Sequence, residues 1–443
     1  MGETTTFKGR LCAVVGAGRS GRAAARLLDA QGARVRVLER DPDGVPDDFA
    51  AWAGTRGVEI AAGEHGADQF RGASLVVLSP GIVPHLIRPL LPDPAPPVMA
   101  ELELAWRCLE RSGNRGRVLA VTGTNGKTTT TALAAHVLRT AGWDVFEGGN
   151  IGTPLSEHVL AGHGRDARTA QVLVLEVSSF QAMGLDEFRP EVAALLNFSA
   201  NHLDWHADLE EYLWAKLRIF ARMDGEDLAL VHESLRPLLE KRTFTGARLR
   251  WFGASDRFEC PSLPGEHNQA NMEAAYQATR RFGIDERDMR DALATFTPHP
   301  HRLQQVGELG GVTFVDDSKS TTLESLRAAL ESFDRPVLLM AGGVFKGGDP
   351  GELRGLVERK VKAVGLFGDS REVFEAAWSG VAPVAWSPNL RGALAGLMAH
   401  ADPGDVVLLS PATASFDLYA DYKARGRDFQ DAVRALSTAR EAS

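Results

Sequence analysis

The sequence predicts an α/β protein with three consecutive domains, at residues 1–98, 99–299 and 300–443. Short apolar runs, which are typical of buried parallel strands, alternate along the chain with stretches of helical pattern. Two of these runs lead directly into glycine-rich turns, at 16–21 and 123–128. We therefore expect Rossmann-like sheets in the first and last domains and a domain of the phosphate-loop type between them.

Composition narrows the class of protein. The chain has 443 residues and a formal net charge of −9, and 44% of its residues are hydrophobic, which is enough for several cores. The sequence contains no block of Lys and Arg residues, so we do not expect a nucleic-acid partner. Its three scattered cysteines (Cys12, Cys108, Cys260) suit a reducing compartment. The N-terminus lacks a signal-peptide core, and no apolar stretch approaches the roughly 20 residues of a membrane span. We expect a cytoplasmic protein without membrane insertion.

The first domain opens with a strand at 11–15, a Gly-Ala-Gly-Arg-Ser-Gly turn, a helix and a second strand that ends at Glu39. Glycines in such a turn let the backbone approach a pyrophosphate at a helix N-terminus, and the acid contacts a ribose. A nicotinamide dinucleotide is the default ligand of this pattern. The alternative is a turn that only packs helix on strand. A third strand, 75–78, runs into Ser-Pro-Gly81 at the sheet end where ligands bind.

The second domain contains the clearest motif. The strand 118–121 leads into Thr-Gly-Thr-Asn-Gly-Lys-Thr-Thr at 122–129, and a helix follows. Backbone N–H groups of such a loop cradle phosphates, Lys127 would neutralise them, and the Thr128 hydroxyl would bind Mg²⁺. The first glycine of the usual motif is replaced by Val121. The strand before the loop and the helix after it nevertheless predict nucleotide binding.

Four further polar side chains of this domain follow apolar strands or lie on a predicted helix. Glu176 ends the strand 172–175 and could hold Mg²⁺ opposite the loop, or it could be a surface acid. His202 follows the next strand on the expected nucleotide side, whereas we interpret His206 as structural. The periodicity of the surrounding apolar residues places Lys216 on the solvated face of an amphipathic helix.

The third domain again alternates strands with helical stretches, and the strands are expected at 312–315, 337–340, 361–367 and 406–409. We find no short repeat and no low-complexity segment in the chain.

Several motifs together resemble the Mur ligase family, and the resemblance covers the whole chain. The loop 123–128 lacks the first glycine in the family's manner, Gly-Glu-His-Asn-Gln-Ala-Asn at 265–271 is similar to its adenine-contacting helix start, and His301-Arg302 is similar to its inter-domain arginine. The segments 148–152, 176–181, 315–321 and 409–417, together with Tyr422 and the segment 425–429, resemble the member that joins D-glutamate to UDP-N-acetylmuramoyl-L-alanine. The resemblance implies an ATP-dependent ligase of peptidoglycan precursor synthesis that works through an acyl phosphate and releases ADP and phosphate.

The resemblance also implies roles for single residues. ATP would be bound by Gly123, Thr124, Asn125, Gly126, Lys127, Thr128, Thr129, Asn150, Asn268, Asn271, Arg302 and Asp317. Two Mg²⁺ ions would be held by Thr128, Glu176, His202 and a carbamylated Lys216, and the catalytic residues would be Lys127, His202 and Lys216. The uridine nucleotide, in place of a nicotinamide cofactor, would be bound by Gly18, Ser20, Glu39 and Gly81. The other substrate residues would be Lys319, Thr321, Lys346, Ser415 and Tyr422. We expect a monomer.

Other protein classes stay open at this stage. Folylpolyglutamate synthase and other Mur ligases share the chemistry, although the folate enzyme starts with its phosphate loop and lacks the first domain. A nicotinamide oxidoreductase fused to an ATP-binding module would bind nicotinamide and not a uridine nucleotide. A non-catalytic nucleotide-binding regulator would release no ADP in response to an amino acid.

Overall fold

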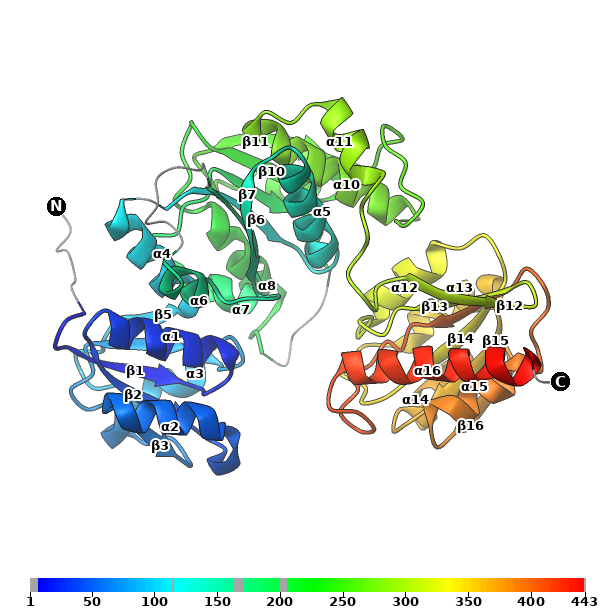
Figure 1. Cartoon of the computed structure of the whole chain (residues 1–443), viewed down its shortest axis with the longest axis horizontal. Coiled ribbons are helices and arrows are strands. Elements are labelled where there is room, and N and C mark those ends of the chain that lie inside the picture. Colours follow the sequence, from blue (N-terminus) through cyan, green and yellow to red (C-terminus); the bar gives the residue numbers. More distant parts are fainter. Residues whose placement is uncertain (1–6, 114, 163–170, 200–204, 264, 442–443) are drawn as a thin grey trace. The chain divides into compact units, whose positions relative to one another are not determined.

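The computed structural model describes residues 7–113, 115–162, 171–199, 205–263 and 265–441 (Figure 1). It contains three sheets with helices between their strands, which confirms the α/β fold class. Two compact units divide the chain: the first comprises Met1–Gly253 and Asn271–Ala292, and the second Ala254–Ala270 and Leu293–Ser443. The domain limits near 98 and 299 stay predictions. The first limit falls inside β5 (Val98–Ala100), which belongs to the first sheet.

The first sheet is parallel and has the strand order β3-β2-β1-β4-β5. Helices α1 and α2 pack on the same face of it, because Leu28 of α1 and Phe49 of α2 belong to one hydrophobic core with Val14 of β1. The glycine turn allows close packing, because a Cβ at Gly21 would lie 1.9 Å from the Gly16 carbonyl oxygen. The elements are β1 (Leu11–Val15), α1 (Arg19–Ala30), β2 (Arg34–Glu39), α2 (Asp47–Arg56), β3 (Glu59–Ala62), β4 (Leu75–Leu78), α3 (Pro84–Ile87), β5 (Val98–Ala100) and α4 (Glu101–Ser112).

The second sheet is also parallel, with the order β11-β10-β9-β6-β8-β7. Its central strands are fully buried, which explains their continuous apolar sequences. The elements are β6 (Arg117–Thr122), α5 (Lys127–Thr140), β7 (Asp144–Gly149), α6 (Leu155–Leu160), β8 (Gln171–Glu176), α7 (Ser179–Met183), β9 (Val192–Leu195), α8 (Leu209–Leu217), β10 (Leu228–His232), α9 (Arg236–Leu239), β11 (Arg248–Phe252), α10 (Glu266–Thr279) and α11 (Glu286–Leu293).

One hydrophobic core joins these two sheets within the first unit. It includes Val14 of β1 and Val118 of β6, together with Leu104 of α4 and Leu155 of α6. Helices α1, α4 and α6 pack against one another between the sheets. This shared core explains why the first two predicted domains form a single compact unit.

The third sheet has the order β12-β13-β17-β14-β15-β16 and is mixed. Strand β12 pairs antiparallel with β13 across a tight turn in which Gly310 and Gly311 have positive φ angles of 61° and 80°. The sequence did not predict β12, because this half-exposed edge strand, Gln-Gln-Val-Gly-Glu-Leu, has no apolar run. The elements are β12 (Gln304–Leu309), β13 (Val312–Asp316), α12 (Leu323–Glu331), β14 (Val337–Gly342), α13 (Arg354–Lys360), β15 (Val361–Phe367), α14 (Arg371–Trp378), β16 (Val384–Ser387), α15 (Leu390–Met398), β17 (Val406–Leu409) and α16 (Tyr422–Glu441).

Candidate active site

The glycine-rich loop 123–126 joins β6 to α5 at the carboxyl end of the second sheet. Gly126 has a φ of 80°, and a Cβ there would lie 2.4 Å from Asn271 Oδ1, so only glycine fits at this position. The Lys127 ammonium folds back and donates hydrogen bonds to the carbonyls of Gly123 (2.9 Å) and Thr124 (2.8 Å). The loop and α5 therefore present a cation and helix N–H groups at one point, as an anion site requires.

A buried carboxylate lies beside this loop. Glu176, at the end of β8, is 2% exposed, so the alternative of a surface acid is wrong. Its Oε2 accepts a hydrogen bond from Thr128 Oγ1 (2.7 Å), and its Oε1 accepts one from Asn150 Nδ2 (2.7 Å). The structure thus brings together three predicted residues that come from α5, from the turn after β7 and from β8.

Lys216 is buried at the same loop. Its side chain is 1% exposed, and its Nζ donates to the Gly123 carbonyl (2.8 Å), the carbonyl that Lys127 also contacts. The prediction of a solvated helix face is therefore wrong, because the polar side of α8 is covered by the phosphate loop. Burial lowers the pKa of Lys216 well below its ordinary value, and the charge of Lys127 lowers it further, against the opposing effect of Glu176.

Other predicted nucleotide residues lie in the loop itself, on α5 and on α10. The Thr124 hydroxyl lies 3.3 Å from the Tyr212 hydroxyl, and the backbone N–H of Asn125 donates to Asn197 Oδ1 (2.8 Å). Asn271 Oδ1 accepts from a threonine hydroxyl of α5 (3.2 Å), whereas Thr129 is half-buried on that helix. Asn268 is 4% exposed and belongs to the second unit.

Two histidines have different outcomes. His202 lies outside the described residues, so its predicted role stays a prediction. His206 is 1% exposed, packs against the rings of Phe180, Trp205 and Tyr212, and has its Nε2 3.0 Å from Ser179 Oγ. This environment supports our structural interpretation of His206.

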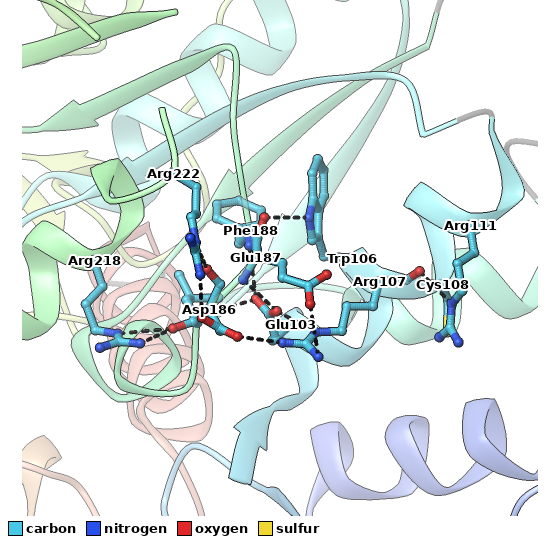
Figure 2. Close-up of polar contacts among 11 residues, drawn as sticks. Glu103, Trp106, Arg107, Cys108, Arg111, Asp186, Glu187, Phe188, Arg218 and Arg222 are labelled. Carbon is cyan, nitrogen blue, oxygen red and sulfur yellow. Dashed lines mark hydrogen bonds and ion pairs between the residues drawn. The ribbon is translucent and has the colours of Figure 1, made fainter. Parts of the chain in front are cut away.

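Figure 2 shows a polar network that anchors the end of helix α8. The buried Glu103 of α4 accepts hydrogen bonds from the backbone N–H groups of residues 186–188 (3.0, 2.8 and 3.1 Å) and from Arg107 Nε (2.7 Å). Arg218 and Arg222, which follow α8, donate to backbone carbonyls of the same loop. The helix that carries the buried lysine is therefore tied to α4 through this loop.

The N-terminal glycine turn carries four of the predicted substrate residues on or near it. Gly18 caps α1 and is exposed, as is Gly81 after β4, and Ser20 is half-buried. Glu39 Oε2 accepts a hydrogen bond from the backbone N–H of Ala17 (2.6 Å). The predicted acid therefore already uses one donor of the turn.

Sequence reasoning missed Arg19, which lies inside this turn. Its Nη1 donates to the Gly152 carbonyl (2.5 Å), and it forms an ion pair with Glu157 (3.1 Å). Arg19 thereby links the first glycine turn to the segment that follows Asn150. An arginine between the glycines of the turn was the only signal in the sequence.

In the second unit, Asp317 lies directly after β13. Its Oδ2 accepts from Ser410 Oγ (2.9 Å), and its Oδ1 accepts from the backbone N–H of Leu303 (3.3 Å). Burial raises the pKa of Asp317 to about 7, although the bond from Ser410 and the charge of Arg302 oppose this shift. Arg302 stands between His301 and Leu303, whose positive φ angles of 66° and 42° make this bend strained.

The predicted amino-acid residues gather at one edge of the third sheet. Lys319 and Thr321 follow β13, Lys346 follows β14, Ser415 follows β17, and Tyr422 begins α16. These three parallel strands are neighbours, so their carboxyl ends share an edge. The Lys319 ammonium lies 4.1 Å from the centre of the Tyr422 ring. Lys346 is exposed, whereas Ser415 is 3% exposed.

Sequence reasoning assigned no role to Arg425, although this residue belongs to a segment used for the resemblance. This fully buried side chain donates to the loops that follow β13, β14 and β17.

Among the described residues, no group of three or more His, Cys, Asp or Glu side chains could hold a metal ion. A magnesium site beside the phosphate loop would depend on the Thr128 hydroxyl, Glu176 and a modified Lys216.

Comparison with known proteins identifies the family. Residues 121–260 match the Mur ligase middle domain, and residues 301–413 match the Mur ligase glutamate ligase domain. The UDP-N-acetylmuramoylalanine–D-glutamate ligase of Nitratidesulfovibrio vulgaris (strain DP4) is 55% identical over 430 residues, which is 97% of this chain and 97% of that protein. The chain belongs to the Mur ligase family. The protein of the same name from Lawsonia intracellularis is 44% identical over 96% of this Mur ligase and 94% of its own length.

Solved Mur ligases have the same fold. MurF from Thermotoga maritima in complex with ADP superposes with a TM-score of 0.60 at 18% identity, over 91% of this chain and 96% of that one. UDP-N-acetylmuramate–alanine ligase MurC from the same organism gives a TM-score of 0.56 at 20% identity, over 96% and 99% of the chains. Within the described residues, no helix combines the length and the hydrophobicity that a membrane crossing requires.

Proposed function

We infer that this Mur ligase joins D-glutamate to UDP-N-acetylmuramoyl-L-alanine in peptidoglycan synthesis, with cleavage of ATP to ADP and phosphate through an acyl phosphate. One observation carries the inference: relatives of that specificity are 55% identical over 97% of the chain. The phosphate loop beside Glu176 and Lys216 supplies the ATP chemistry that the family needs.

The reaction requires activation of the substrate carboxylate, because an amine does not displace oxide from a free carboxylate. Transfer of the γ-phosphoryl group converts that carboxylate to an acyl phosphate, which has a good leaving group. The amine of D-glutamate then attacks the acyl carbon, and the tetrahedral intermediate collapses to the amide and phosphate. Catalysis therefore consists mainly of positioning and of charge neutralisation during phosphoryl transfer.

The phosphate loop performs the neutralisation. Lys127 now donates to two loop carbonyls, and these bonds would be exchanged for phosphate oxygens of ATP. The N–H groups at the start of α5 point toward the same place, and the lysine adds a full charge. Thr124, Asn125 and Thr129 complete the loop, and Asn150, Asn268, Asn271, Arg302 and Asp317 are the further proposed nucleotide contacts.

The residues beside the loop suit magnesium. Thr128 and Glu176 offer the hard oxygen ligands that Mg²⁺ prefers, and they already lie 2.7 Å apart. Bound Mg²⁺ would offset the charge of the transferring phosphoryl group. We propose that Lys216 carries a carbamate, because its buried amine has a lowered pKa and a carbamate would present oxygens where an ammonium is repelled. His202 is proposed as a further ligand, and as the base for the D-glutamate ammonium if it is free of metal.

The substrates are assigned to the remaining residues. The uridine nucleotide would bind at the first glycine turn, through Gly18, Ser20, Glu39 and Gly81. D-Glutamate would bind at the edge of the third sheet, through Thr321, Lys346, Ser415 and Tyr422, with Lys319 as a further substrate residue. We also propose that the enzyme acts as a monomer in the cytoplasm.

One experiment tests this function. Phosphate release is measured with ATP, Mg²⁺, UDP-N-acetylmuramoyl-L-alanine and a panel of amino acids, and each component is omitted in turn. We expect turnover only in the complete mixture and with D-glutamate. Faster turnover with L-lysine or meso-diaminopimelate would assign the chain to another specificity. ADP release independent of any amino acid would contradict the ligase reaction itself.

A further inference from the structure

A single buried arginine connects the segments of the second unit that carry the proposed D-glutamate residues. Arg425 lies in the first turn of α16, and its side chain is 0% exposed. Its Nε donates to Ser318 Oγ (3.0 Å), and its Nη2 donates to the carbonyls of Ser318 (2.9 Å) and Thr413 (3.1 Å). Its Nη1 donates to the carbonyls of Gly342 and Ala414, both at 3.3 Å. These partners follow three neighbouring strands, β13, β14 and β17.

The partners of this guanidinium are neutral. Among the described residues, no carboxylate forms an ion pair with Arg425, and burial lowers its pKa to about 10. A buried charge without a direct counter-ion is costly, and an apolar side chain often gives a more stable core at such a position. Guanidinium does offer five donors in one rigid plane, whereas an ammonium offers three on a flexible stem. Arg425 is thus suited to holding several carbonyls in a defined arrangement.

The connected loops are also closely packed against each other. Val344 and Ala414 exchange two backbone hydrogen bonds (2.9 and 3.0 Å). A Cβ at Gly343 would lie 2.2 Å from the Ala414 carbonyl oxygen and 3.1 Å from Arg425 Nη1. A shift of one loop therefore displaces the other. The loop after β14 leads to Lys346, and the loop after β17 carries Ser415.

We propose that Arg425 is a positioning residue for amino-acid binding: it sets the relative places of the three loops at the edge of the third sheet. This inference rests on the proposed function, since those loops carry the proposed D-glutamate contacts. Within the described residues, the side-chain hydrogen bonds of Arg425 go to neighbours of the proposed contacts Lys319 and Ser415 and not to the side chains of these two residues. Its loss should therefore weaken D-glutamate binding and leave the phosphate loop and the first glycine turn, which belong to the first unit, unaffected.

Steady-state kinetics of the full chain test this inference. The variants are Arg425→Lys, Arg425→Met, Ser318→Ala and Thr413→Val, where the last removes the hydroxyl bond to the Gly342 carbonyl (2.6 Å). We expect the KM for D-glutamate to rise at least about ten-fold in the Arg425 variants and less in the others, with the KM for the uridine nucleotide within about two-fold. The KM for ATP should rise less than that for D-glutamate, because only one proposed nucleotide contact, Asp317, adjoins a partner of Arg425. Arg425→Lys should restore little, because one ammonium cannot reach all of these carbonyls.

The matched control is Arg427→Ala, which removes an exposed arginine two positions later on the same helix and should change no KM. Equal rises in all three KM values, or an unchanged KM for D-glutamate with a smaller active fraction, would overturn the inference and leave Arg425 a purely structural residue. If Arg425→Met fails to fold, Ser318→Ala and Thr413→Val decide by the same criterion. A wild-type chain that does not use D-glutamate would instead refute the proposed function.

Discussion

Removal of the Glu103 carboxylate should release the loop that holds the end of α8. Glu103 is 0% exposed and accepts three backbone hydrogen bonds and one from Arg107. Glu103→Ala removes the shared acceptor of three backbone N–H groups, of which that of Phe188 is buried, whereas Arg107 keeps its ion pairs with Asp186 and Glu187; such a loss typically costs about 3 kcal/mol. If that energy appears as local opening, exchange of the three amides 186–188 should accelerate by about two orders of magnitude or more.

Hydrogen exchange measured by mass spectrometry on the full chain tests this estimate. Peptides that cover residues 186–188 should lose protection in Glu103→Ala, and less so in Glu103→Gln, which keeps one acceptor oxygen. Peptides from α8 should follow, because Arg218 and Arg222 bond to the same loop. The control is Glu110→Ala on the same helix, whose half-exposed ion pair with Arg115 is worth at most about 1 kcal/mol. Unchanged protection of residues 186–188 in a folded Glu103→Ala variant would refute the reasoning.

Four further predictions concern single buried or ligand-facing groups. Lys127→Ala should reduce turnover by at least about three orders of magnitude at unchanged melting temperature, because its charge acts on the phosphoryl group; an enzyme with a tenth of its activity would exclude this loop as the ATP site. Lys216→Ala should be almost inactive with Mg²⁺, and added formate or acetate should partly restore turnover by replacing the carbamate oxygens; normal activity would return Lys216 to a structural role. Lys346→Ala should raise the KM for D-glutamate far more than that for ATP, since the ammonium would face a substrate carboxylate; equal effects would contradict its placement. Burial raises the pKa of Glu101 from 4.5 to about 7, and its Oε2 has no hydrogen-bond partner in the described part of the chain. The folded state thus binds the extra proton, so stability is lost as pH rises from about 4.5 through 7. The free energy of unfolding of Glu101→Gln, measured against wild type, should therefore increase over that range by about 3 kcal/mol in total. A pH-independent difference would show that Glu101 does not titrate there.

Continuous apolar runs made most central strands predictable. The strands 11–15, 75–78, 361–367 and 406–409 have the predicted limits in the structure. Strands buried on both faces have no polar alternation, so their sequences contain the signal in full. Edge strands such as β12 have no such run, and only the neighbouring chain decides their pairing.

The candidate site also has one part that the sequence predicts and one part that it does not. The phosphate loop is local, because one strand, one turn and one helix place Gly123–Thr128 in sequence order, and the motif could be read directly. Lys216 could not, since helical periodicity reports the side that faces the core and not the loop from 93 residues away that covers the other side.

The sequence by itself determined the α/β class, the phosphate loop and, through several spaced motifs, the family, because these depend on residues close together in the chain. Only the tertiary structure decided which charges are buried. Glu103, Lys216 and Arg425 have the composition of surface residues, yet each is at most 1% exposed and is satisfied by backbone groups distant in the sequence. A charged side chain is stable in the interior only where such partners converge, and no local pattern encodes that convergence.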